Sequence, residues 1–237
     1  MKDINIYSAA DQAIQIMNRD MLRDFGKLKT SKLDELHILR DVTEVYRKQA
    51  QKARKRYYEI GFEAFLLGLY LCGIQGKKAQ QMAEKAISPE WVDAFLKDIN
   101  LVTGFRFDTE TERKAQRLAE ALTAEAERAE DGASGGGGRR PAAPVSGKDL
   151  LIDRAIKDWS RQVGQYAIDI TDAALMEAYE AEEMPKVKWI SVEDNRRCTE
   201  CRERHGKIFP LDEVPPKPHW GCRCKLVPAG EVTEEKA

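Results

Sequence analysis

The stretch LRDVTEVYRKQAQKARKRYYEIGFEAFLL, residues 39–67, has the apolar pattern of one long helix. Its apolar residues recur at alternating steps of three and four, the spacing that aligns side chains on one face of an α-helix. They are Leu39, Val42, Tyr46, Ala50, Ala53, Tyr57, Ile60, Ala64 and Leu67. The small side chains at the middle of this face allow a second helix to approach closely. The pattern fits a helix of the same chain and a helix of a partner equally well, so self-association is possible.

Signals on the carboxyl side of this stretch predict further helices. Gly73 and Gly76 end the apolar pattern, and Ser88 followed by Pro89 is typical of a helix start. A further helix begins at 108–112, where acidic side chains favour the positive end of the helix dipole. Its sequence is so highly charged that we expect it to be mostly exposed. Residues 1–130 are therefore expected to form a helical N-terminal domain.

Residues 131–148 are rich in glycine and proline, a composition that predicts a flexible linker. A second apolar pattern of helical period follows and predicts a long amphipathic helix over 149–185. The apolar positions of this helix are Ile152, Ile156, Trp159, Val163, Ala167, Ile170 and Ala174.

The last part of the chain has strand composition in two places, 187–192 and 222–227. We expect residues 186–228 to form a small module and 229–237 to form a disordered tail. The predicted fold class is mainly α, with a helical N-terminal domain and a small C-terminal α+β module stabilised by zinc.

The prediction of zinc comes from the cysteines, four of which lie within the last forty residues. They form the patterns Cys198-x2-Cys201 and His219-x2-Cys222-x-Cys224. Thiolates and an imidazole at such spacings can close a tetrahedral metal shell. Cys222 and Cys224 would point to the same face if the chain between them is an extended strand. Five candidate ligands compete for about four positions, and the sequence does not choose among them.

Other interpretations of these residues were weighed against a structural zinc site. Two disulfides are typical of small secreted domains, but the N-terminus has no signal-peptide pattern. Simple packing of reduced thiols fits the isolated Cys72 better than the cluster. His205 is a sixth candidate ligand, more typical of a loop or surface residue. No glutamate follows either histidine at the spacing of a zinc deaminase, so a zinc hydrolase or nuclease is less favoured and no catalytic or cofactor-binding residue is assigned.

The net charge of −1 hides a basic run at 47–56 that contains no acid. Such a run is more often a solvated helix face, and its functional alternative is contact with phosphates or an acidic partner. A zinc-containing nucleic-acid-binding protein is therefore an alternative function. No apolar stretch approaches the roughly 20 residues that a membrane-spanning helix needs, so we expect a soluble, intracellular chain without membrane contacts.

The terminal motif resembles the phage Mu F-like minor head protein family, also called phage head morphogenesis proteins. The resemblance is carried by four segments in a fixed order, over about a fifth of the chain. They are Trp189–Ser191, Asp194–Cys201, His205–Phe209 and Pro218–Cys224. Cys198, Cys201, His219, Cys222 and Cys224 match the family's metal-chelating Cys/His set. Trp220 stands where the family commonly has proline, which should alter the local turn and leave ligation intact.

The resemblance implies a non-enzymatic structural protein that acts in capsid assembly and remains inside the virion, near the portal and the packaged DNA. Its implied partners are the portal protein, or scaffold and capsid proteins, and possibly DNA. During assembly it would be present in the host cytoplasm.

Overall fold

The long helix expected around residues 39–67 is helix α2, Ile38–Leu71. The computed structural model describes residues 5–30, 37–133, 147–193, 195 and 197–229. Seven of the nine predicted face positions, from Val42 to Ala64, are buried. Leu39 is 59% exposed, because Ile38 instead occupies the buried position at the start of the helix. The helix ends before Gly73, whose φ of 87° suits a residue without a side chain.

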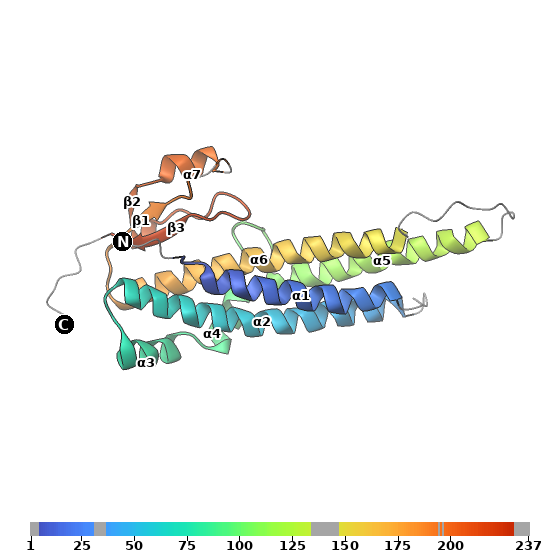
Figure 1. Cartoon of the computed structure of the whole chain (residues 1–237), viewed down its shortest axis with the longest axis horizontal. Helices are drawn as coiled ribbons and strands as arrows, with labels where there is room; N and C mark the ends of the chain where they lie inside the picture. The colour runs from blue at the N-terminus through green and yellow to red at the C-terminus, as the bar shows by residue number, and fades with distance from the viewer. Residues whose placement is uncertain (1–4, 31–36, 134–146, 194, 196, 230–237) are drawn as a thin grey trace.

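Four long helices lie beside one another and alternate in direction along the chain (Figure 1). They are α1 (Ser8–Thr30), α2, α5 (Phe107–Ala133) and α6 (Gly147–Ala181). Two shorter helices, α3 (Gly76–Ala86) and α4 (Pro89–Lys97), lie within the connection from α2 to α5. The hydroxyl of Ser88 accepts a hydrogen bond from the backbone N–H of Trp91, which confirms the predicted start of α4.

Helix α6 packs against α1, α2 and α5. It starts two residues earlier than the predicted helix over 149–185, and its end lies four residues earlier than the predicted end. The expected linker, 131–148, lies mostly outside the described residues; its first three residues belong to α5 and its last two to α6. All seven apolar positions predicted for this helix are buried. The chain on both sides of the glycine-rich segment therefore contributes to one helical core.

Helix α5 is less exposed than its charge predicted. One of its faces is buried against α2 and α6, and this face carries Ala115, Leu118, Ala119 and Leu122. Aromatic rings fill the layer between the helices: Phe25 meets Tyr46 edge-on at 5.0 Å, and Tyr46 meets Trp159 at 5.4 Å between ring centroids. Such edge-to-face contacts add to the stabilisation from burial alone.

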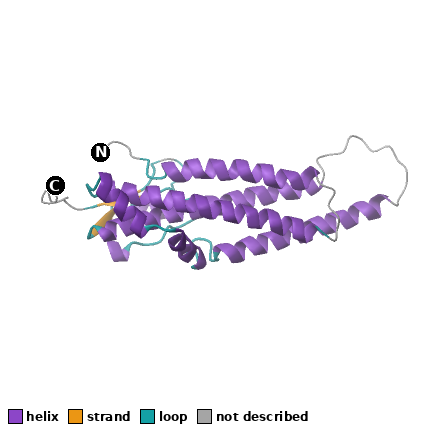
Figure 2. Cartoon of the chain, turned by 90° about the horizontal axis from the view of Figure 1, so that it is seen from below, coloured by secondary structure: helices purple, strands orange, loops and turns teal. Residues whose placement is uncertain are grey.

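A small α+β module follows α6 and lies at one end of the helices (Figures 1 and 2). Its strands are β1 (Lys186–Ile190), β2 (Ile208–Pro210) and β3 (Lys225–Pro228), joined antiparallel in the order β2-β1-β3. Helix α7 (Thr199–Arg204) lies between β1 and β2, and a short 3-10 helix, η1 (Leu211–Glu213), follows β2. The fold class is thus mainly α with a small antiparallel sheet, as predicted.

Both predicted strands are displaced. The first was expected over 187–192 and spans Lys186–Ile190, and the second was expected over 222–227 and begins at Lys225. Cys222 and Cys224 therefore precede β3. The backbone groups before Lys225 bond elsewhere: the Cys222 N–H donates to the His219 carbonyl, and the Cys224 carbonyl accepts from Tyr7 and Lys217.

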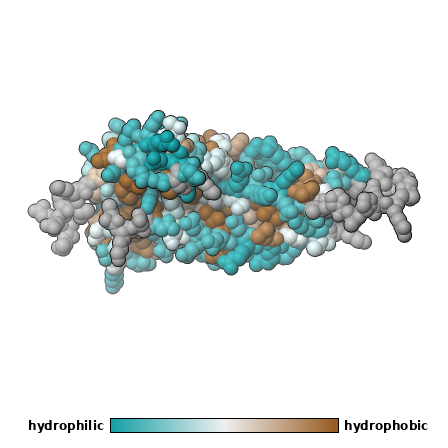
Figure 3. All heavy atoms as spheres, turned by 45° about the horizontal axis from the view of Figure 1, so that its top comes forward, coloured by the Kyte–Doolittle hydropathy of each residue, from teal (hydrophilic) through white to brown (hydrophobic). Residues whose placement is uncertain are grey.

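The expected tail lies outside the described residues apart from Ala229, whose N–H donates to the Lys186 carbonyl. Hydrophilic residues cover most of the face drawn in Figure 3, and apolar residues are exposed there in separate patches. Within the described part of the chain, no helix combines the length and apolar character needed to span a bilayer.

Candidate metal centre

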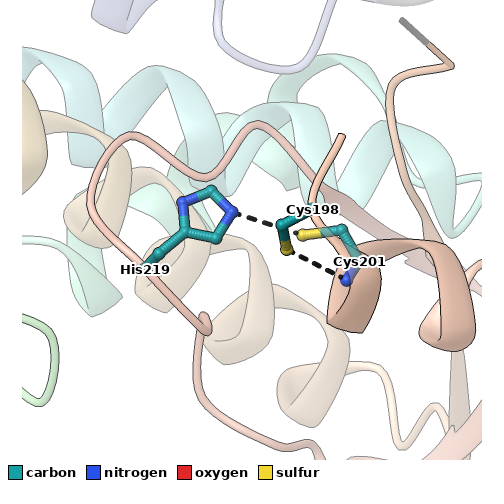
Figure 4. A group of neighbouring side chains, drawn as sticks. All are labelled: Cys198, Cys201 and His219. Carbon is teal, nitrogen blue, oxygen red and sulfur yellow. Dashed lines mark hydrogen bonds between the residues drawn. The ribbon is translucent and has the colours of Figure 1, made fainter. Parts of the chain in front are cut away.

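The first half of the centre is the start of helix α7. Cys198 is the N-cap residue of this helix, and its sulfur accepts a hydrogen bond of 3.3 Å from the backbone N–H of Cys201. An N-cap side chain normally bonds the amide two or three residues later, so the Cys-x2-Cys spacing turns both sulfurs to the same side. Figure 4 shows the two sulfurs together, with the ring of His219 directed at them.

The second half is a tight turn before β3. The Cys222 N–H donates to the His219 carbonyl at 3.3 Å, and Gly221 has a φ of 65°, in the left-handed region that favours glycine. The Gly221 N–H donates to Oε1 of Gln165 on α6 at 2.7 Å. The turn is thereby attached to the helical core, and this attachment fixes where His219 and Cys222 lie.

The structure brings all five predicted ligands together in two groups that share Cys201. One group is Cys198, Cys201 and His219, and the other is Cys201, Cys222 and Cys224; the donor atoms within each group lie within 4.8 Å of one another. The Cys201 sulfur lies 3.6 Å from Nε2 of His219 and 3.6 Å from the Cys222 sulfur. A tetrahedral zinc shell places two sulfurs about 3.8 Å apart and a sulfur and a nitrogen about 3.6 Å apart. The spacing of the donors fits zinc.

The hydrogen bond of the other ring nitrogen of His219 selects a ligating tautomer. Nδ1 lies 2.9 Å from the Trp220 carbonyl oxygen, which can only accept, so Nδ1 carries the proton. In the neutral ring with this tautomer, the lone pair is on Nε2, which faces Cys201. Metal-bound histidines are commonly oriented by such a bond to a carbonyl. Trp220, which replaces the expected proline, supplies this carbonyl and has a side chain that is 46% exposed.

Burial and mutual contact limit the ionisation of the three buried cysteines. Burial raises the pKa of the Cys201 thiol to about 12. The pKa of Cys222 is raised by its contact with Cys224 and then by burial, whereas the same contact lowers the pKa of Cys224. Neighbouring thiols therefore do not ionise together. A divalent cation between them would stabilise the additional thiolates, and its binding would release protons.

The cysteines are free thiols in this structure, and Cys201 and Cys222 are separated by far more than the roughly 2.05 Å of a disulfide. A cavity of about 350 Å³ opens beside the two groups and leaves Cys198 and His219 half-buried. Such an opening offers a route for metal entry. Neither group contains a carboxylate: one consists of two cysteines and a histidine, and the other of three cysteines.

The two other candidate residues lie outside both groups. Nδ1 of His205, at the end of α7, lies 3.2 Å from the Ser191 N–H and 3.0 Å from the Ser191 hydroxyl. Cys72 is buried at the end of α2, and burial raises the pKa of its thiol to about 11. Both positions agree with the interpretations made from the sequence.

A buried polar contact beside the centre was not predicted from the sequence. The Tyr7 hydroxyl lies 2.7 Å from Oδ1 of Asp172 and 2.6 Å from the Cys224 carbonyl oxygen. Lys217 donates to the Tyr7 hydroxyl at 2.8 Å and to the Cys224 carbonyl, and its amine lies 3.0 Å from Oδ2 of Asp172. This contact, which we call the Tyr7–Asp172–Lys217 triad, joins α1, α6 and the module. Its members are far apart in sequence, so no spacing could have revealed it.

The basic run at 47–56 is largely engaged with acids. Arg47, Lys52, Arg54 and Arg56 each form ion pairs, and their carboxylate partners lie on four helices: Glu44, Asp20, Asp24, Asp93, Asp108 and Glu59. These cations are neutralised within the fold, which favours the helix-face interpretation over a phosphate-binding one.

Comparison with known proteins gives one match. The family model described as "Phage Mu protein F like protein" matches residues 159–227, which confirms the resemblance drawn from the Cys/His motif. No curated protein and no solved structure matches the chain. The matched segment begins inside α6 and contains the helix residues that hold the module: Gln165, Asp172 and Tyr179, the last donating to the Leu226 carbonyl at 3.1 Å.

Proposed function

We propose that the chain is a non-enzymatic structural component of a tailed-phage head that acts during capsid assembly. The observation that carries this proposal is the Cys/His centre, because it lies within the segment that matches the Phage Mu protein F-like family. The centre is attached to α6 inside that same segment. The proposed location is the virion interior, near the portal and the packaged DNA.

The proposed cofactor is one Zn²⁺ ion with a structural role. Its candidate ligands are Cys198, Cys201, His219, Cys222 and Cys224. Sulfur and nitrogen donors favour zinc over magnesium or calcium, which prefer oxygen. Cys201 belongs to both groups of donors and is therefore expected among the four that bind. Bound zinc would close the turn before β3 onto the start of α7.

The proposed partners are the portal protein, scaffold or capsid proteins. The long helices supply most of the surface of the chain, and the module occupies one end of them (Figure 1). This arrangement suits a protein whose helices bind other proteins while a metal fixes the fold of its end. Contact with DNA and self-association are compatible with the same surface.

The proposal is tested in a phage that encodes this protein. Quantitative mass spectrometry of purified virions should detect the chain in the head at low copy number. A nonsense mutation in its gene should yield defective heads and a reduced burst of infectious particles. Complementation with the wild-type gene, but not with Cys201→Ser, should restore infectivity. Absence of the chain from virions and from assembly intermediates, with normal infectivity of the nonsense mutant, would refute the proposed function.

A further inference from the structure

A second cavity lies between the α4–α5 connection and the module, away from the Cys/His centre. Its volume is about 210 Å³. Asp169 of α6 lines this cavity. Its apolar lining consists of Phe95, Ile99, Leu101, Val102 and Pro216. Concave apolar sites with a few polar groups are the usual form of ligand and side-chain pockets.

Asp169 is half-buried, and its direct hydrogen-bond partners are neutral. Its Oδ2 accepts a hydrogen bond of 2.6 Å from the Asn100 amide, and its Oδ1 accepts one of 2.8 Å from the Gln165 amide. Within the described part of the chain, no lysine, arginine or histidine forms an ion pair with it. The nearby cation, Lys217, is already paired with Asp172 at 3.0 Å.

A carboxylate that is partly withdrawn from water and has no direct ion pair is energetically unfavourable. Burial raises the pKa of Asp169 to about 6; the nearby Asp172 adds to this effect, and the amides of Asn100 and Gln165 and the nearby Lys217 counteract part of it. The other titratable groups that line the cavity are Asp98 and Lys217, so the lining has an excess of negative charge. A cation entering the cavity would relieve the cost of the buried charge.

The loop above the cavity presents apolar side chains from a defined backbone. The Asn100 side-chain oxygen accepts hydrogen bonds from the N–H groups of Val102 and Thr103, at 3.0 and 2.9 Å. Its amide nitrogen bonds Asp169, so one side chain fixes the turn and attaches it to α6. Leu101 is 81% exposed and Ile99 is 58% exposed on this turn. A preorganised apolar surface loses little entropy when a partner covers it.

We propose that this cavity receives a lysine or arginine side chain of a protein partner. The cationic head group pairs with Asp169, and the aliphatic stem packs between Leu101 and Pro216. The exposed leucine and isoleucine beside the cavity favour a protein over a small free amine, because a small amine would leave them uncovered. The Asn100 turn and Asp169 form a surface distinct from the metal centre.

The test uses a matched pair of probes, N-acetyl-arginine methylamide and its neutral isostere N-acetyl-citrulline methylamide. Each is titrated into the full-length, methyl-labelled protein while the NMR signals of Ile99, Leu101 and Val102 are followed. The arginine probe should shift these signals and bind about tenfold more tightly than the citrulline probe, since charge-assisted hydrogen bonds are the stronger kind.

Three variants separate the roles of the groups. Asp169→Asn should abolish the preference for arginine over citrulline, whereas Asp11→Asn, at an exposed site on α1, should keep it. Asparagine keeps an acceptor oxygen at only one of the two positions that Asn100 and Gln165 contact, so a variant that leaves Asp169 intact is also needed. Leu101→Ser, on the exposed turn, should weaken both probes alike and keep the preference.

Equal binding of the two probes to the wild-type protein would overturn the proposal, as would an unchanged arginine preference in Asp169→Asn. Putrescine binding more tightly than the arginine probe would assign the cavity to a small amine and would also overturn it. None of the three variants changes a cysteine or histidine of the centre, so failure here leaves the proposed function standing.

Discussion

Cys201 differs from the other four candidate ligands in its position. It is the residue common to both groups of donors, and it is also among the most buried, at 3% exposure. Its position is fixed by its own backbone, because its N–H donates to the Cys198 sulfur at the start of α7. A change at this one side chain therefore affects both groups of donors, and four of the five possible sets of four ligands include it.

Replacing Cys201 by serine should abolish stoichiometric zinc binding. The loss of affinity should exceed the about 10- to 100-fold that is typical when a residue outside the ligand shell is changed. The measurement is the zinc content of protein purified under reducing conditions, where the wild-type chain should contain about one ion.

Cys72→Ser is the matched control, because Cys72 is also a buried free thiol but lies at the end of α2. This variant should retain its zinc. Equal zinc contents in the wild-type chain and in Cys201→Ser would exclude the centre as the binding site. A wild-type protein without zinc in reducing buffer would refute the metal proposal itself.

The ligand set was predictable from the sequence at the level of single residues, whereas its surroundings were not. The Cys-x2-Cys and Cys-x-Cys spacings are local, and all five candidates converge in the structure. Lys217, by contrast, is an ordinary basic residue in the sequence, yet its side chain is only 7% exposed. Its burial depends on Tyr7, directly before α1, and Asp172 on α6, which lie far from Lys217 in the sequence.

At the scale of the elements, α2 and α6 approach each other closely at Gly68. A Cβ atom added at Gly68 would lie 2.6 Å from the Cβ of Ala178 and 3.3 Å from the Leu175 carbonyl oxygen. Neither neighbour can move without moving its helix. Gly68 lies on α2. Gly164, which lies on α6, has more space, since the nearest atom to an added Cβ is Cδ1 of Ile14 at 3.8 Å.

Gly68→Ala should therefore destabilise the protein by about 1–3 kcal/mol, the usual cost of overpacking, despite the better helix propensity of alanine. Gly164→Ala should instead stabilise it by up to about 1 kcal/mol, because no clash opposes the gain in propensity. Chemical denaturation measures the change in unfolding free energy for both variants, provided that their m-values equal that of the wild-type protein. A stabilised Gly68→Ala protein would contradict the close α2–α6 packing.

Periodicity predicted the long helices well because burial of one face repeats over many turns. It failed at the short strand β3, which starts three residues after Cys222. The left-handed Gly221 and the bonds of the Cys224 carbonyl to Tyr7 and Lys217 keep the preceding residues out of the sheet. Such constraints come from α1 and from the turn itself, and strand propensity does not contain them.

At the scale of the whole molecule, one hydrophobic core continues from the helices into the module, and a few polar contacts reinforce the junction. Its helical part is aromatic and extends along α1, α2, α5 and α6, and its part in the module is smaller, with Val187, Trp189 and Leu226 buried at the three-stranded sheet. The Gln165–Gly221 bond, the Tyr179–Leu226 bond and the Tyr7–Asp172–Lys217 triad connect them. A small sheet with so few buried residues is expected to depend on additional cross-links.

Removal of zinc by a chelator should therefore loosen the module and leave the helices folded. Hydrogen exchange measured by mass spectrometry should become at least about tenfold faster over 197–227 and at the start of α1, which directly follows Tyr7 and its contact with Cys224. Exchange in α2 and α5 should not change, because their core contacts involve no residue of the centre. Chelator should have no further effect on Cys201→Ser. If exchange in α2 accelerates together with exchange in the module, the helices and the module unfold as one unit; if exchange changes nowhere, the metal does not stabilise the fold.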